Sequence, residues 1–122
     1  MDSEQNYIIE LIGISPIQAV DYFLFLNKKS NYNVIEKVFE YLKQRSEKCL
    51  HVFLHHLHLK DKILSVPYNH YQPRLYAKYN PEWLLKFLKS TQEYSEDEVL
   101  KLCSENQMME ETVYILEKKS NK

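Results

Sequence analysis

Apolar residues recur along this chain every three or four positions, which is the spacing that places them on one face of an α-helix. No run shows the strict alternation that is typical of a half-buried strand. The pattern therefore predicts an all-α fold of about seven helices with no sheet. After a brief first run over 7–12, the predicted helices cover 16–28, 33–45, 47–60, 73–79, 81–90, 96–105 and 107–118.

Several predicted helices begin at a residue whose side-chain oxygen can accept a hydrogen bond from a backbone N–H of the first turn. A glutamate three residues later adds a capping box, and a proline at the first helical position has its φ angle already set. These start signals are Ser15 before Pro16, Asn33 with Glu36, Asn80 before Pro81, and Ser95 with Glu98. At the other end of a helix, Gly13 is predicted to end the first run.

The helical period also predicts which side chains face the core. Residues 16–28 are apolar nearly all round, so we expect neighbours to cover this helix on both sides. The inward sets of the later helices are Val34, Ile35, Val38, Phe39 and Leu42; Leu50, Phe53, Leu54 and Leu57; Leu75, Tyr76 and Tyr79; Trp83, Leu84, Phe87 and Leu88; and Met109, Thr112, Val113 and Leu116.

The segment 62–72 interrupts the helical period, and Pro67 disfavours helix at the residue before it. We interpret 62–72 as an irregular connector between two helical halves. The chain has one glycine in 122 residues, whereas the turns of a β-protein of this size would need several. Short helices with short links predict an α-solenoid of antiparallel helix hairpins or a small bundle, with 1–122 as a single α-helical repeat segment.

Charge and composition narrow the possible partners. Sixteen lysine and arginine residues against seventeen aspartate and glutamate residues leave a net charge of −1, so we expect no nucleic-acid partner and only indirect membrane contact. No apolar run approaches the ~20 residues that span a bilayer, and the N-terminus lacks the basic segment of a signal peptide. Cys49 and Cys103 have no CxxC spacing, which is typical of reduced thiols in a cytoplasmic protein.

Three histidines are the main candidates for a metal site. His51, His55 and His58 lie at i, i+4 and i+7, so a helix presents them on one face, and neutral imidazoles are good zinc ligands. The sequence HHLH lacks the glutamate of an HExxH motif, and no nearby Cys or Asp pair supplies a fourth ligand. We therefore interpret the three residues as a partly exposed polar face or a partner surface, and expect no metal there.

No other pattern predicts a catalytic or cofactor-binding residue, so we expect a protein that is not an enzyme. Cys49 lies near His51, but their positions on one helix point the two side chains in different directions. The acidic residues between 93 and 98 stand at a helix start, where they match the positive end of the helix dipole.

Four stretches in the second half of the chain carry a resemblance to a known family. They are LYAKY at 75–79, FLKS at 87–90, LKLC at 100–103 and MEETVYIL at 109–116. Together they resemble the clathrin-heavy-chain-type repeat region in the family of the vacuolar protein sorting-associated subunit 41 of the HOPS tethering complex, or of a close relative in the same tethering superfamily. The resemblance covers about the last fifty residues well and extends more loosely back to LHVFLHHLHLKD.

The resemblance implies a stack of helix hairpins without catalytic residues. It also implies a role in tethering late endosomes and other vesicles to the vacuole or lysosome before fusion, together with other tethering-complex subunits, Rab GTPases and fusion machinery. The implied location is cytoplasmic and peripheral on late endosome, vacuole and lysosome membranes. Because the family's β-propeller and zinc-binding RING are not among these 122 residues, we expect a segment of a larger protein.

Two functions from different classes remain open. The first is a scaffold segment of a vesicle-tethering complex, and the second is a compact helical protein-binding module unrelated to trafficking. An excised solenoid leaves apolar faces uncovered at its ends and should self-associate, whereas a complete bundle should be monomeric.

Overall fold

A computed structural model describes the backbone of residues 3–121 and the side chains of residues 7–121. All regular elements of this part of the chain are helical, which confirms the predicted all-α fold. Instead of about seven helices, residues 3–121 form nine α-helices and two short 3-10 helices. They are α1 (Ser3–Ile14), α2 (Pro16–Lys29), α3 (Val34–Arg45), α4 (Glu47–Lys60), α5 (Lys62–Ser65), η1 (Val66–Tyr68), α6 (Gln72–Tyr79), η2 (Pro81–Trp83), α7 (Leu84–Ser90), α8 (Glu96–Glu105) and α9 (Met109–Ser120).

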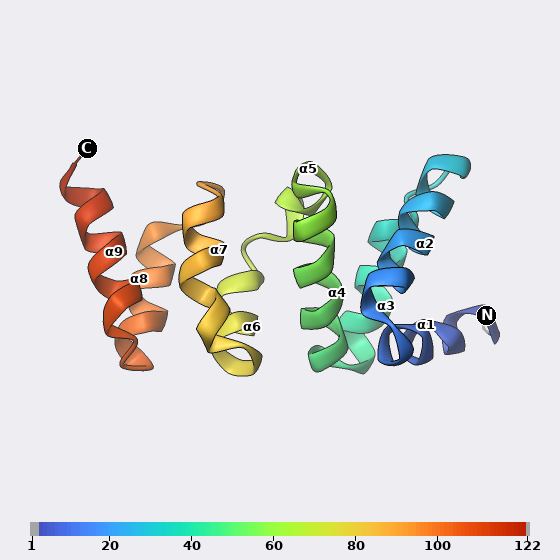
Figure 1. Cartoon of the computed structure of the whole chain (residues 1–122), viewed down its shortest axis with the longest axis horizontal. Coiled ribbons are helices and arrows are strands. Elements are labelled where there is room, and N and C mark those ends of the chain that lie inside the picture. The colour runs from blue at the N-terminus through green and yellow to red at the C-terminus, as the bar shows by residue number, and fades with distance from the viewer. Residues whose placement is uncertain (1–2, 122) are drawn as a thin grey trace. The chain divides into compact units, whose positions relative to one another are not determined.

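The chain folds as two compact units, Met1–Ser65 and Val66–Lys122. Unit 1 contains α1 to α5. Helix α2 packs against α1, α3 and α4, and α4 also packs against α1, α3 and α5. Figure 1 shows α2, α3 and α4 as neighbouring helices of this unit. A short helix hairpin cannot bury its apolar face alone, so these contacts form the core of unit 1.

Side-chain caps fix the helix starts in unit 1. Ser15 accepts a hydrogen bond from a backbone N–H three residues later at 3.4 Å, and Asn33 does the same at 3.0 Å, which confirms both predicted starts. The sequence did not reveal a second cap: Oδ1 of Asn27, in the last turn of α2, accepts from the N–H groups of Val34 at 2.9 Å and Ile35 at 3.3 Å. The end of α2 thereby satisfies N–H groups that α3 cannot satisfy itself.

Helix α1 runs through Gly13 and ends at Ile14, so the predicted stop at Gly13 is wrong. Gly13 does not adopt a positive φ, which a left-handed helix cap would require. Ser15 is the first extended residue, with φ −155° and ψ 97°. The stop comes from the Ser15–Pro16 pair, because the residue before a proline disfavours helical geometry.

The core of unit 1 contains the predicted inward faces of α3 and α4. Helix α2 adds Ala19, Val20 and Phe23, whereas Leu24 and Leu26 are only partly buried and its remaining apolar residues stay about half exposed. The prediction that neighbouring helices cover α2 on both sides is therefore wrong for the described residues, because its neighbours bury only one face of the helix. The exposed residues of α2 are Ile17 at 51%, Tyr22 at 48% and Phe25 at 52%.

The predicted irregular connector 62–72 contains two short helical turns. In α5 the carboxylate of Asp61 accepts from the N–H of Leu64 at 3.2 Å, and the Ser65 hydroxyl donates to the Lys62 carbonyl at 2.9 Å. The 3-10 helix η1 follows, and a turn at 69–71 leads into α6. The segment lacks a helical apolar period because its turns are too short to show one.

Unit 2 packs α6, α7, α8 and α9 around a second core. Helix α6 contacts α7 and α8, and α9 contacts α7 and α8. Figure 1 shows α8 and α9 side by side. The predicted inward faces of α6 and α7 supply much of this core, with Trp83 packed against it. The buried cluster is Tyr76, Leu84, Phe87, Leu88, Val99, Cys103 and Ile115.

The two predicted helix starts in unit 2 have different outcomes. The Ser95 hydroxyl accepts from the backbone N–H of Glu98 at 3.2 Å, which confirms the start of α8. Asn80 makes no side-chain cap, so that prediction is wrong. Its ψ of 58° lies outside the extended region in which N-cap side chains usually reach the next turn. The chain instead passes through η2 before α7 begins at Leu84.

The turn between α8 and α9 has the hydrogen bonds of a Schellman motif. Gln107 has a φ of 58°, the N–H of Met108 donates to the Cys103 carbonyl at 2.9 Å, and the N–H of Gln107 donates to the Ser104 carbonyl at 3.3 Å. The left-handed residue ends α8, so the last helix begins at Met109 instead of Gln107.

Helix α9 buries a different face from the predicted one. Ile115 is fully buried and Glu111 is 8% exposed, and this face lies toward the core of unit 2. The prediction failed because α9 has apolar residues on two faces, and the period alone does not reveal which face α7 and α8 cover. Of the predicted inward residues, Met109 is 73%, Val113 43% and Leu116 49% exposed, and Thr112 is half-buried.

Candidate interaction surfaces

The histidine face of α4 is buried, and the prediction that it is partly exposed is wrong. His51, His55 and His58 are 4%, 9% and 4% exposed. The rings of His51 and His55 stack with centroids 5.9 Å apart, and Nδ1 of His58 lies 3.2 Å from Oγ of Ser65. The helical period showed that the three share a face but not that the fold covers it.

The buried histidines are neutral at pH 7. Burial is the main cause that lowers the pKa of His51 and of His55 to about 4, and repulsion from neighbouring histidines makes a smaller contribution. Burial and the nearby Lys62 also lower the pKa of His58. Neutral imidazole is the metal-binding form, but within residues 7–121 no group of three or more His, Cys, Asp or Glu side chains is placed to hold a metal ion. The three rings are packed in the interior of the fold.

Both cysteines are free thiols. Cys103 is fully buried in the core of unit 2, and burial, with a smaller contribution from Glu111, raises its pKa to about 11. The thiolate is the nucleophilic form, so Cys103 is unreactive at pH 7. Cys49 is partly exposed near the start of α4.

The acidic residues at the start of α8 bind the lysines at the end of α9. Oδ1 of Asp97 accepts from Nζ of Lys119 at 2.8 Å, and Nζ of Lys118 lies 3.5 Å from Oε2 of Glu96. Lys118 also donates to the Tyr94 hydroxyl at 2.8 Å. Besides matching the helix dipole, these carboxylates join two helices.

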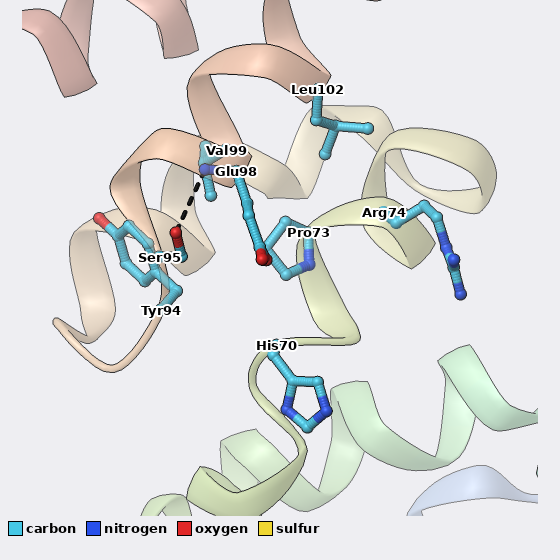
Figure 2. A pocket seen from close by; sticks show the side chains of 8 residues that line it. All are labelled: His70, Pro73, Arg74, Tyr94, Ser95, Glu98, Val99 and Leu102. Atoms are coloured by element: carbon cyan, nitrogen blue, oxygen red, sulfur yellow. Dashed lines mark hydrogen bonds between the residues drawn. The ribbon is translucent and has the colours of Figure 1, made fainter.

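A small cavity of about 60 Å³ lies between α6 and the start of α8. Figure 2 shows Ser95 hydrogen-bonded to the backbone of Glu98, with Arg74 extending away from Ser95. Sequence reasoning did not find this cavity, because it depends on how α6 and α8 pack. A few water molecules would fill it, whereas small-molecule sites typically measure about 300–1,000 Å³. The lining residues are His70, Pro73, Arg74, Tyr94, Ser95, Glu98, Val99 and Leu102.

Exposed apolar side chains gather on several parts of the surface instead. In unit 1 they lie around the end of α4, where Leu59 is 55% and Ile63 is 83% exposed, and on α1 and α2, where Ile14 is 76% and Phe25 is 52% exposed. Single exposed apolar residues are ordinary, but several on one helix pair form a candidate interaction surface. The set is Tyr7, Leu11, Ile14, Ile17, Tyr22 and Phe25.

In unit 2 the exposed residues form a line along α9, which we name the α9 stripe: Met109, Val113, Leu116 and Ser120. They lie at i, i+4, i+7 and i+11, so they share one face of the helix. A groove of about 390 Å³ follows the second half of the stripe, lined by Val113, Leu116, Glu117, Ser120 and Asn121. None of the described helices is long and apolar enough to cross a membrane.

Comparison with known proteins identifies relatives of the whole chain. A family model described as the Vps41 TPR-like region matches residues 1–122. The vacuolar protein sorting-associated protein 41 homolog of Homo sapiens is 34% identical over 119 residues, which is 98% of this chain and 14% of that protein. The homolog of Danio rerio is 33% identical over the same shares, and that of Solanum lycopersicum is 29% identical over 98% of this chain and 13% of its own length. No solved structure matches significantly.

The chain thus spans only about 14% of the length of relatives whose names refer to vacuolar protein sorting. The sequence resemblance rested on about the last fifty residues, and the family match extends it over all 122. A TPR-like repeat region also agrees with the predicted α-solenoid class and with the helices seen in both units. The chain therefore belongs to the Vps41 TPR-like family.

Proposed function

We propose that this chain is a non-enzymatic scaffold segment of a vesicle-tethering complex that acts in transport from endosomes to the vacuole or lysosome. The observation that carries the proposal is the match of all 122 residues to the Vps41 TPR-like region. The names of the relatives, which refer to vacuolar protein sorting, support the trafficking part. In this function the chain provides a rigid binding surface for other proteins and catalyses no reaction.

The partners in this proposal are other tethering-complex subunits and trafficking proteins. The exposed apolar side chains of α1, α2 and α9 support protein partners, because folded monomers rarely expose such groups together. These partners bring the chain to late endosome, vacuole and lysosome membranes, where it is peripheral and cytoplasmic. Nucleic acid is not a partner, since a net charge of −1 provides no electrostatic footprint for it.

The sequence predicts that the chain self-associates through its solenoid ends. In this proposal the exposed residues of α1 and α2 form that contact between copies. Ile14 and Ile17 flank the corner between the two helices and are 76% and 51% exposed. Burying two such side chains in a second copy is favourable by about 1.5–3 kcal/mol each. Sedimentation velocity at increasing concentration should show larger species for the wild-type chain and fewer for an Ile14→Asp/Ile17→Asp variant. A monomer at every concentration would contradict this assignment.

Depletion of the protein in its own cells tests the trafficking function. Uptake of a fluid-phase dye at the plasma membrane should continue at its normal rate, because the proposal places the protein later on the route. Arrival of the dye in the vacuole or lysosome should slow several-fold and recover when the wild-type protein is restored. Unchanged arrival kinetics after depletion would overturn the proposed function.

A further inference from the structure

We propose that residues 69–72, which lead into α6, form a segment that opens locally while the rest of unit 2 stays folded. The inference adds a movable element to the scaffold function proposed above and does not depend on that function. Three observations on the same four residues lead to it. They are two buried amides without hydrogen bonds, a turn held by local backbone bonds, and a helix start without a side-chain cap.

The two amides are the side chains of Asn69 and Gln72. Asn69 is 1% exposed and Gln72 is 0% exposed, so both residues are buried. Within residues 7–121, neither the amide nitrogen nor the amide oxygen of either side chain has a hydrogen-bond partner. A side-chain amide can donate two hydrogen bonds and accept two, and water satisfies these groups readily. The closed segment therefore loses hydrogen bonds to water that the described part of the fold does not replace.

The burial of Asn69 and Gln72 also limits what could supply the missing bonds. A further chain that covers the surface of unit 2 cannot reach side chains that are already buried. The small cavity between α6 and α8 is lined by His70 and Pro73 and by neither of the two amide residues, so water in that cavity would not lie beside them. Opening of the segment is then the change that brings both amides into contact with water.

The backbone of the segment is held by local hydrogen bonds. The N–H of Tyr71 donates to the Tyr68 carbonyl at 3.0 Å, and the N–H of Gln72 donates to the Asn69 carbonyl at 3.2 Å. Both bonds span three residues, as in a 3-10 helix, in which hydrogen-bond geometry is poorer than in an α-helix. The N–H of Leu75 donates to the Tyr71 carbonyl at the longer distance of 3.4 Å. Opening the segment therefore breaks weak bonds between close neighbours in the chain.

The start of α6 lacks the side-chain cap that stabilises α8. Tyr71 is the N-cap residue of α6, its side chain makes no cap hydrogen bond, and its φ of −83° and ψ of −25° are helical instead of extended. In contrast, the Ser95 hydroxyl caps α8 at 3.2 Å. A helix of eight residues is also too short to be stable without its packing contacts. The first turn of α6 should therefore open together with residues 69–72.

Native-state hydrogen exchange of the 122-residue chain tests the inference. In the wild type, the backbone amide of Leu75 should be protected about tenfold less than the amides of Leu88 and Cys103, which lie in the core of the same unit. Low concentrations of urea should leave the exchange of Leu75 nearly unchanged, because a local opening exposes little surface. The same concentrations should accelerate exchange at Leu88 and Cys103.

A pair of substitutions tests the cause of the opening. Asn69→Leu/Gln72→Met replaces each amide by an apolar side chain of similar shape, which needs no hydrogen bond. Protection at Leu75 should rise about tenfold, which corresponds to about 1.4 kcal/mol in the opening equilibrium. Asn31→Leu/Gln92→Met is the matched control, because it makes the same two changes at exposed residues, and it should leave protection at Leu75 unchanged. Circular dichroism of each variant verifies its helical fold.

Three results would overturn the inference. They are equal protection of Leu75, Leu88 and Cys103 in the wild type, equal effects of the two pairs of substitutions, and lower protection at Leu75 in a folded Asn69→Leu/Gln72→Met variant. The last would show that the two amides form hydrogen bonds in the closed state. If that variant does not fold, the wild-type measurement decides by itself. The experiment has no trafficking readout, so its failure leaves the scaffold function standing.

Discussion

The side-chain nitrogen of Lys118 lies 2.8 Å from the hydroxyl oxygen of Tyr94 and donates a hydrogen bond to it, which ties the end of α9 to the segment before α8. The Tyr94 hydroxyl donates in turn to the Leu88 carbonyl at 3.1 Å, at the end of α7. Burial alone would lower the pKa of Lys118, but its hydrogen bond to Tyr94 and the charges nearby raise it. One lysine thereby connects three helices of unit 2.

Replacing Lys118 should destabilise the chain more than replacing its neighbour. Lys118→Met removes a hydrogen bond from a charged group at a side chain that is only 16% exposed, so we expect the free energy of unfolding to fall by about 1–2 kcal/mol. Lys119→Met is the matched control, because its contact with Asp97 lies on the surface. Urea denaturation measures both. Equal effects of the two substitutions would contradict a connecting function for Lys118.

Glycine at position 107 should stabilise the chain. Gln107 adopts a φ of 58°, a left-handed conformation that costs a residue with a Cβ about 1 kcal/mol and glycine almost nothing. Gln107→Gly should therefore raise the free energy of unfolding by about 0.5–1 kcal/mol. Asn106→Gly is the control, because Asn106 has a φ of −102° and gains nothing from the change. A thermal melt in which Asn106→Gly stabilises as much as Gln107→Gly would refute this reading of the turn.

The helix starts that the sequence predicted correctly depend on residues a few positions apart. Ser15, Asn33 and Ser95 each bond an N–H three residues later, so the sequence contains both partners. The wrong predictions depend on packing. Val113 and Ile115 lie on two faces of α9, and only contact with α7 and α8 decides that Ile115 is buried.

The candidate sites also combine features that follow from spacing in the sequence with features that depend on packing. That His51, His55 and His58 share a face follows from their spacing, whereas their burial arises only in the folded chain and does not follow from the spacing. The α9 stripe is visible in the sequence as an apolar face, but its exposure is not. A signal for the exposed face was available in the sequence. Met108 just before α9, with Tyr114 and Ile115 within it, forms a second apolar group, and a surface helix of a folded protein typically buries only one apolar face.

Acid should weaken the fold through the buried histidines. The folded-state pKa of His51 is about 4 against an ordinary 6.5, so the unfolded chain binds the proton first as the pH falls. The contribution of His51 to stability is therefore complete above pH 6.5, declines between pH 6.5 and 4, and is constant below that window. Between pH 7 and pH 5 we expect the wild type to lose about 2 kcal/mol more than a His51→Gln variant.

Urea denaturation at pH 7, 6 and 5 measures this difference. His70→Gln is the control, because it makes the same substitution at an exposed histidine. Equal losses in the wild type and in His51→Gln would show that His51 is not buried as a neutral base.

Replacing Gly13 by alanine should stabilise the chain against thermal unfolding. A Cβ added to Gly13 would meet no atom within 4 Å, and the residue lies inside α1 without a positive φ. Alanine has the higher helix propensity, by about 1 kcal/mol, so Gly13→Ala should raise the melting temperature by a few degrees. A lower melting temperature would mean that the fold requires glycine at position 13, although an added Cβ would contact no other atom.

The central claim is that this chain acts in vesicle tethering through its exposed helical surfaces, and the direct measurement is dye delivery in depleted cells that express surface variants. Val113→Asp/Leu116→Asp places charge on the α9 stripe, and Leu59→Asp/Ile63→Asp places it at 55% and 83% exposed apolar residues elsewhere. We predict that the wild type and the Leu59→Asp/Ile63→Asp control restore arrival of the dye in the vacuole or lysosome, whereas Val113→Asp/Leu116→Asp does not. Full restoration by a normally folded and expressed Val113→Asp/Leu116→Asp variant would contradict the claim.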